Sequence, residues 1–296
     1  MRLSDLATVV PFEIVRDGEF LSLGLLNGKN PAMLACLHDP ARAGNWRTNE
    51  NIACVLTTAD LAPSVPEKFG LAVTPAPRER FLDAQRYLGA ETDFYGRGFE
   101  SEISHDAAID SSAHVASRNV RIGEGCVVEA GAIILERVTL ESGAVIRAGA
   151  VIGAEGFHPV PYGDGIRNMP HHGSVHLGKG VDIGSNSVIC RSVFNNPTGI
   201  GDGTLIGPLV YVAHGVTLGR RCRIAASARI CGSSVLGDGV TVGPNAVISN
   251  LVHVGDDATV SIGSVVVRNV GAGQRVTGHF AVEHQQFIET WGRLFK

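Results

Sequence analysis

The sequence predicts a mainly β protein, with a parallel β-helix of hexapeptide repeats preceded by a small α/β domain and followed by a short helix. Two observations predict the β-helix. An aliphatic residue occupies every sixth position from Ile200 to Val266, and Gly often follows it, as at Gly201 and Gly207. Neither the 3.6-residue period of a helix nor the two-residue alternation of a strand gives this spacing.

Short strands joined by tight turns do produce a six-residue period, because Gly accepts the positive φ of a sharp corner. Three hexads complete one triangular coil. Residues 18 apart are therefore expected to stack on the same face of the β-helix.

Residues 1–100 lack the six-residue period and are predicted to form the α/β domain. A helix is expected from Arg78 to Leu88, because Phe81, Ala84 and Leu88 share one face and Gly89 stops it. Residues 91–101 are predicted to be a linker. The strands predicted from β-branched and aromatic runs between turn residues are Phe12–Val15, Phe20–Leu26, Ala32–Leu37, Ala53–Thr57 and Gly70–Val73.

The hexad begins at Ile103, slips by one residue after Val115 and runs from Ile122 to Ile152. Residues 156–165 are too rich in Pro and Gly to predict a strand, so an inserted loop is expected there. The period returns at Leu177 and is interrupted again at residues 195–197. About nine to ten coils are expected, and the inserted loop is a candidate binding element because such loops lie on one face of a solenoid.

The period ends near Val270, and residues 282–295 are predicted to form a short amphipathic helix that caps the open end of the β-helix. Its expected packing face holds Phe287, Trp291, Leu294 and Phe295. The predicted domains are residues 1–100 (α/β), 101–278 (β-helix) and 279–296 (C-terminal helix).

Composition excludes several classes of protein. A net charge of −4 gives no basic surface for a nucleic acid. The first residues lack the apolar core of a signal peptide, and no apolar run reaches the roughly 20 residues of a spanning helix. Six cysteines without a Cys-x-x-Cys pair predict free thiols. A cytoplasmic protein with no membrane insertion is expected.

The hexad and four stretches of sequence carry a family resemblance. The stretches are Asp39-Pro40, residues 152–157, residues 181–184 with Arg191, and residues 211–214. In this order and spacing the chain resembles the hexapeptide-repeat acyltransferases, and among them the UDP-3-O-acylglucosamine N-acyltransferase family of lipid A synthesis, over nearly its entire length. The resemblance implies a left-handed parallel β-helix and a nucleotide-sugar-binding role for residues 1–100.

The same resemblance implies a homotrimer with active sites between neighbouring β-helices. It implies transfer of an acyl group from a thioester donor, acyl carrier protein with its 4'-phosphopantetheine or coenzyme A, to the amine of a nucleotide-linked amino sugar. No bound cofactor is expected. By resemblance, His214 is the general base and the Gly232 amide faces the thioester oxygen.

The residues themselves fit this chemistry. Imidazole is the natural base near neutral pH, and Gly232 lies 18 residues, one coil or about 5 Å, from His214. A backbone N–H there could stabilise the oxyanion. The predicted substrate contacts are Phe157 and His158 in the inserted loop, Arg191 as a phosphate partner, Asp39 in the α/β domain, and Asn196 and Asn250, which the 18-residue count places on the coils beside His214 and Gly232.

Other functions remain open at this point. His171 and His176 are five residues apart, which is also the spacing of two zinc ligands in hexapeptide-repeat carbonic anhydrases, although no third ligand is evident. A catalytically inert scaffold trimer and a short-chain acyl-CoA-dependent N-acyltransferase of another nucleotide amino sugar are the further alternatives.

Overall fold

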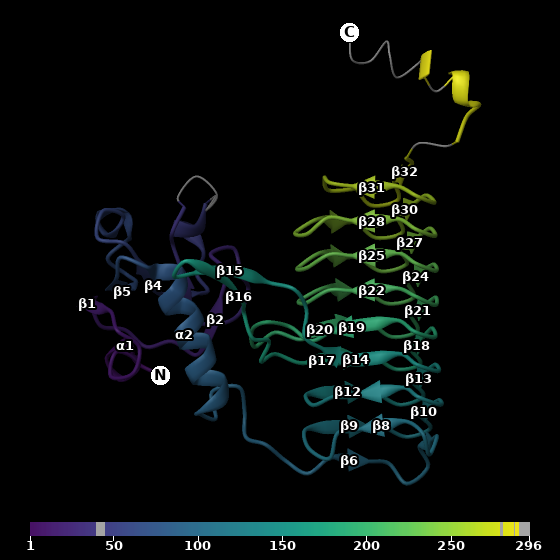
Figure 1. Cartoon of the computed structure of the whole chain (residues 1–296), viewed down its shortest axis with the longest axis horizontal. Coiled ribbons are helices and arrows are strands. Elements are labelled where there is room, and N and C mark those ends of the chain that lie inside the picture. The colour runs from purple at the N-terminus through teal and green to yellow at the C-terminus, as the bar shows by residue number, and fades with distance from the viewer. Residues whose placement is uncertain (40–44, 279–280, 287, 290–296) are drawn as a thin grey trace.

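The computed structural model describes residues 1–39, 45–278, 281–286 and 288–289. Figure 1 shows a β-helix of stacked coils with a smaller α/β domain beside it, and a hairpin that reaches from the β-helix to that domain. The predicted fold class is confirmed: most strands are parallel and pair across successive coils.

The α/β domain is a five-stranded sheet in the order β1-β5-β4-β3-β2, in which only β1 runs antiparallel to its neighbour. The four parallel strands explain the apolar runs in the sequence, since such strands are buried on both faces. The elements are α1 (Leu3–Leu6), β1 (Glu13–Arg16), β2 (Ser22–Gly24), β3 (Met33–Cys36), β4 (Ile52–Thr57), β5 (Gly70–Val73), α2 (Pro77–Ala90) and the 3₁₀ turns Trp46–Thr48 and Ala62–Ser64.

The predicted helix is confirmed, although it runs past Gly89 to Ala90. Gly89 allows close packing between the domains, because a Cβ there would lie 2.2 Å from His172 of the β-helix domain. The buried side chains Phe81 and Leu88 pack in one cluster with Leu34 of β3. Helix α2 therefore covers one face of the sheet, and its last turn also packs against the β-helix domain.

The β-helix consists of three parallel sheets whose strands are stacked one coil above the next. The first sheet holds β6 (Glu102–Ile103), β9 (Val120–Ile122), β12 (Val138–Leu140), β17 (Val175–Leu177), β20 (Thr198–Ile200), β23 (Thr217–Leu218), β26 (Val235–Leu236) and β29 (His253–Val254). The second holds β7 (Ala108–Ile109), β10 (Val127–Val128), β13 (Val145–Ile146), β18 (Asp182–Ile183), β21 (Leu205–Ile206), β24 (Arg223–Ile224), β27 (Thr241–Val242), β30 (Thr259–Val260) and β32 (Arg275–Val276). The third holds β8 (His114–Val115), β11 (Ile133–Ile134), β14 (Val151–Ala154), β19 (Val188–Cys190), β22 (Tyr211–Val212), β25 (Arg229–Ile230), β28 (Val247–Ile248) and β31 (Val265–Val266).

The hexad determines this architecture because its aliphatic residue is the one that points inward. Ile206, Ile224 and Val242 stack in successive coils, and each is at most 3% exposed. The corners require a positive φ, which Gly203 adopts without strain and which Leu209 adopts at +59°. Each coil thus buries one aliphatic side chain per face.

The structure corrects the prediction for residues 156–165. They are not only a loop, because β15 (Pro159–Tyr162) and β16 (Gly165–Asn168) form an antiparallel hairpin. Both strands of a two-stranded hairpin are edge strands. Proline is therefore tolerated at positions whose backbone N–H would not face the partner strand. The three sheets hold nine, eight and eight strands, so the β-helix has eight coils and one further strand instead of the nine to ten coils expected.

The hairpin ties the two domains together. Val160 and Met169 are buried in the same cluster as the core of the α/β domain. Tyr162 Oη donates to Asp83 Oδ1 of α2 at 2.9 Å, and the Gly163 amide donates to Glu79 Oε1 at 3.0 Å. The inserted segment therefore belongs to both domains.

The predicted cap at the C-terminal end is only partly visible. Phe287, Trp291, Leu294 and Phe295 lie outside the described residues. Of the described residues near them, Val282 and Ile288 are each 50% exposed. Figure 1 shows the described residues 281–286 beyond β32, at the C-terminal end of the β-helix.

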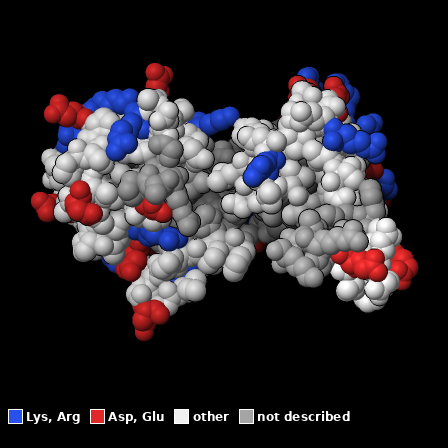
Figure 2. Space-filling model, turned by 90° about the horizontal axis from the view of Figure 1, so that it is seen from above, with Lys and Arg blue, Asp and Glu red and all other residues white. Residues whose placement is uncertain are grey.

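The surface carries mixed charge. Figure 2 shows Lys and Arg interspersed with Asp and Glu at both ends of the visible face, without a surface of one sign. The six cysteines are free thiols, as predicted. Among the described residues, no helix is long and apolar enough to cross a membrane.

Candidate active site

Three histidines from distant parts of the sequence meet at one corner of the β-helix. His214 follows β22, His158 immediately precedes β15, and His171 follows β16. The ring centroids of His158 and His214 are 5.3 Å apart, and those of His171 and His214 are 5.4 Å apart. The two ends of the hairpin therefore place an imidazole on each side of the predicted base.

Hydrogen bonds at the base of the hairpin fix these positions. Asn168 accepts from the His158 amide at 2.7 Å and donates through Nδ2 to the Gly156 carbonyl at 3.0 Å. The Met169 amide donates to the His158 carbonyl at 2.9 Å. Asn168 thus closes the ribbon beside the cluster and sets the point from which His158 projects.

The predicted stacking of His214 and Gly232 is confirmed. Val212 pairs with Ile230 in adjacent coils, so the residues two positions later lie one above the other. A Cβ on Gly232 would lie 2.6 Å from Cε1 of His214. The imidazole therefore fits in this position only because residue 232 is a glycine. In the described part of the chain, no residue accepts a hydrogen bond from the Gly232 amide, while its carbonyl accepts from Leu251 at 3.1 Å.

Burial keeps the histidine cluster neutral. Burial lowers the pKa of His214 to about 4, and the neighbouring His158 and His171 lower it further in the same direction. Burial also lowers the pKa of His171 to about 4, partly opposed by the bond to the Met169 carbonyl, and lowers the pKa of His158. At neutral pH all three imidazoles therefore have a free lone pair.

These shifts predict a pH-dependent stability. The unfolded chain takes up a proton on His171 near pH 6.5, whereas the folded protein does so only near pH 4. The free energy of unfolding should therefore fall as pH drops below about 6.5 and level off below about 4. For His171 alone the loss at pH 5 is on the order of 1–2 kcal/mol. Denaturant unfolding at pH 7 and pH 5 measures it, and His171→Gln should show a smaller difference; an equal difference would contradict the assignment.

A cavity of about 490 Å³ opens beside the cluster, between the α/β domain and the β-helix. His158 and His214 lie in its wall, together with Lys29 and His253. None of the described residues that line it is a carboxylate. Asn, Ser and Thr side chains supply most of the remaining polar groups: Asn27, Asn30, Ser192, Asn196, Thr217 and Ser233. Such a wall suits a neutral or anionic ligand with many hydrogen-bonding groups.

A second hollow of about 650 Å³ adjoins the first on the side of the α/β domain. Asp39 and Trp46 lie in its wall. The two hollows share Leu25, Asn27, Gly28, Lys29 and Leu251, so the loop after β2 and Leu251 form the boundary between them. These two adjoining hollows are together called the path between the α/β domain and His214.

The structure brings some predicted contacts into this path and leaves others outside. Asn196 lines the first cavity, and its Oδ1 accepts from Asn30 of the α/β domain at 3.4 Å. Phe157 is 79% exposed and lines neither hollow. Asn250 is exposed and accepts from Ser249 at 3.4 Å, outside both walls.

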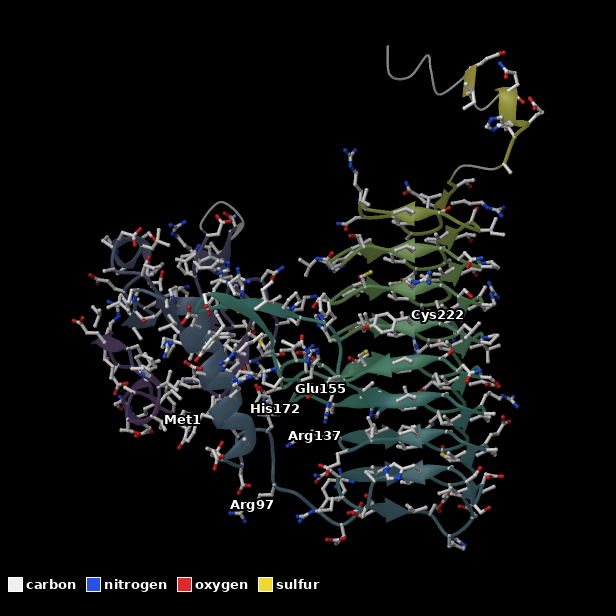
Figure 3. All side chains as sticks on the ribbon, in the orientation of Figure 1. Met1, Arg97, Arg137, Glu155, His172 and Cys222 are labelled. Carbon is white, nitrogen blue, oxygen red and sulfur yellow. The ribbon has the colours of Figure 1, made fainter. Side chains whose placement is uncertain are left out.

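Arg191 lies in a polar network at the domain junction instead of in either hollow. Its guanidinium is 3.5 Å from Glu155, and its Nε is buried without a partner. Figure 3 shows Glu155, Arg137 and His172 where the β-helix faces the α/β domain. Arg137 donates to the Tyr95 carbonyl at 2.8 Å, so residues 91–101, predicted as a linker, are partly fixed by the β-helix.

Several residues of the site were missed from the sequence. Lys29, Asn30, Trp46, Ser192 and Ser233 belong to the two walls but carry no motif of their own. His171 was noticed only as one of a pair of candidate zinc ligands. The signal that could have found its position was the symmetric placement of His158 and His171 around the Pro- and Gly-rich insertion.

The structure places the two candidate zinc ligands in different surroundings. His171 is 1% exposed and packs on His214, whereas His176 lies on β17 with Nε2 at 3.8 Å from Glu141. Within the described ranges, no group of three or more His, Cys, Asp or Glu side chains is arranged to hold a metal ion. The described residues therefore provide no set of ligands for the zinc site that the spacing of His171 and His176 suggested.

The sequence repeats of the β-helix are similar to the hexapeptide repeats of known transferases. The profile of bacterial transferase hexapeptide repeats matches residues 119–154 and 197–232, and that of the hexapeptide repeat of succinyl-transferase matches residues 234–268. A solved UDP-N-acetylglucosamine acyltransferase from Campylobacter jejuni shares the fold, with a TM-score of 0.54 and 21% identity over 66% of this chain and 79% of that one.

Curated relatives confirm the predicted resemblance more specifically. The UDP-3-O-acylglucosamine N-acyltransferase of Caulobacter sp. (strain K31) is 42% identical over 133 residues, which are 45% of this chain and 39% of the relative. The protein of that name from Bordetella pertussis is 35% identical over 162 residues, 51% of this chain and 44% of the relative. The aligned part spans less than half of either relative, so the resemblance is narrower than the near-complete match predicted from the sequence.

Proposed function

We propose that this protein is an N-acyltransferase that moves an acyl group from a thioester donor to the amine of a nucleotide-linked amino sugar, as in lipid A synthesis. The observation that carries the proposal is the placement of His214 above Gly232 in the wall of a cavity that continues into the α/β domain. The relatives named UDP-3-O-acylglucosamine N-acyltransferase support the same reaction.

In this proposal His214 is the general base. Its neutral imidazole takes the proton of the attacking amine while the new C–N bond forms at the thioester carbonyl. The Gly232 amide donates to the oxyanion of the tetrahedral intermediate. When the C–S bond breaks, the proton on His214 passes to the leaving sulfur. No electron is gained or lost, and the enzyme returns to its starting state.

The lowered pKa of His214 fits this role once the substrate is bound. A base with a pKa of about 4 is weak, although it is always deprotonated at neutral pH. The diphosphate of a nucleotide sugar brings negative charge into the cavity, which favours the imidazolium form and raises the pKa toward neutrality. None of the described lining residues is a carboxylate, so the negative charge that raises the pKa of His214 would come from the substrate.

The path between the two hollows suggests how the acceptor is held. The nucleotide would occupy the hollow with Asp39 and Trp46, and the sugar amine would reach His214 past Asn196. Lys29, on the loop between the hollows, is placed to meet the diphosphate. The acyl donor, acyl carrier protein or coenzyme A, would approach from the open side, along a groove completed by a neighbouring β-helix in a homotrimer.

Products made by the purified protein test this function. A panel of nucleotide amino sugars should be offered with hydroxyacyl carrier protein and with acetyl-coenzyme A, and the products identified by mass spectrometry. We expect an amide of a UDP-linked glucosamine with a hydroxyacyl chain. Amides formed only with acetyl-coenzyme A would instead show the short-chain alternative, and the absence of any amide would favour a scaffold protein.

A further inference from the structure

His171 is the most deeply buried member of the histidine cluster and has an unused acceptor. It is 1% exposed, and its Nδ1 lies 2.9 Å from the Met169 carbonyl. A carbonyl oxygen only accepts, so Nδ1 carries the proton and Nε2 holds a lone pair. This Nε2 is buried without any hydrogen-bond partner in the described structure. A buried polar atom without a partner is costly, and one that persists beside a candidate base calls for a functional reason.

The unused atom faces the side of His214. A Cβ placed on Gly156 would lie 3.1 Å from His171 Nε2 and 3.4 Å from His214 Cδ2, so both imidazoles crowd against the same glycine. Their rings meet edge to face, with an interplanar angle of 74°. A Cβ at residue 156 would make a tight contact with His171 and an ordinary contact with His214, so the two rings are neighbours at this backbone position.

We propose that His171 is a positioning residue for His214: its Nε2 accepts the N–H of the His214 imidazole, fixing one tautomer and steadying the imidazolium that forms when the amine proton is taken up. The catalytic part of this inference rests on the proposed function. The ring centroids are 5.4 Å apart in this structure, and the bond forms when the two imidazoles move closer together. His158, on the other side, faces the cavity and remains available to substrate.

Among the described residues, no carboxylate is placed to do this. The charged or titratable groups that act on His171 are His158, Arg191 and His172, and those that act on His214 are His158 and His171. None is a carboxylate. The neutral imidazole of His171 would therefore orient His214, as a carboxylate orients many catalytic histidines.

Paired substitutions separate the two nitrogens of His171. His171→Asn keeps a donor near the position of Nδ1, which can still bond the Met169 carbonyl, but removes the acceptor at Nε2. His171→Gln places an amide oxygen near the position of Nε2. His172→Asn is the matched control, because His172 also has a buried Nε2 without a partner yet packs against Tyr95 and Gly89 instead of His214.

The first measurement does not depend on activity. Full-length protein labelled with ¹⁵N in its histidine rings should show His214 as a single tautomer at pH 7, unchanged in His171→Gln and in His172→Asn, and averaged between two tautomers in His171→Asn. Averaged tautomers of His214 in the wild-type protein would overturn the proposal without any variant, and so would an unaltered tautomer in His171→Asn.

The second measurement is the acyl-transfer rate. We expect His171→Asn to lower kcat by about tenfold or more with the KM for the nucleotide sugar within twofold, and His171→Gln to recover at least a third of the wild-type kcat. Equal rates in all three proteins would overturn the proposal. If the wild-type protein transfers no acyl group, the proposed function fails, while the tautomer of His214 still decides the role of His171.

Discussion

Replacing His214 with Ala should lower kcat for acyl transfer by about 10²–10⁴-fold, the usual contribution of a general base. The fold should persist, because His214 lies in a turn after β22 and the buried Val212 and Val216 keep the coil in place. Steady-state rates measured with a saturating thioester donor test this expectation, and circular dichroism reports the fold.

His176→Ala is the matched control for that experiment. His176 is also a histidine of the β-helix, but it lies on β17 and faces Glu141 at 3.8 Å. Its removal should change kcat by less than about twofold, since the pair is partly exposed and contributes little. A rate for His214→Ala within about threefold of wild type would rule out His214 as the base.

Gly232→Ala should abolish most of the activity while leaving the protein folded. The added Cβ would lie 2.6 Å from Cε1 and 2.7 Å from Nε2 of His214. The imidazole can move more easily than the backbone. We therefore expect the His214 side chain to rotate away from the added Cβ while the backbone keeps its conformation. Displacement of a catalytic group by about 1 Å can cost roughly 10²-fold in rate. We expect a loss of that order in kcat, with the unfolding midpoint nearly unchanged.

Gly165→Ala controls for the effect of adding a methyl group to a glycine of this protein. Gly165 lies in β16, and the nearest atom to an added Cβ is the Tyr162 carbonyl at 3.9 Å. This variant should keep wild-type activity. If Gly232→Ala were equally active, the imidazole would not need its position above Gly232, and the assigned geometry of base and oxyanion donor would be wrong.

The part of the fold that the sequence predicts best is the part with a strict period. Ile206, Ile224 and Val242 recur every 18 residues, and the period alone places them in one buried column. The same count places His214 and Gly232 one coil apart. A repeat fold allows this because each coil contacts mainly its neighbours, so sequence distance converts directly into distance along the axis.

The remainder of the site depends on contacts that no period encodes. The hairpin was predicted as a loop because Pro159, Pro161 and Gly163 disfavour a strand, yet its pairing is stabilised by packing of Val160 on the α/β domain. His158 and His171 meet His214 only because that hairpin closes. Trp46 and Lys29 reach the path through the packing of one domain on another, which residue spacing within either domain cannot indicate.

The hairpin has a consequence for how this protein can be divided. Its Val160 and Met169, with Val193 and Phe194 of the β-helix, complete the hydrophobic core of the α/β domain. A fragment cut at the end of α2 would leave those apolar side chains in water and remove the partners of Tyr162 and Gly163. The β-helix is therefore not a transferable module here. Exchange of the α/β domain between related proteins would have to carry the hairpin, and with it both histidines that flank His214.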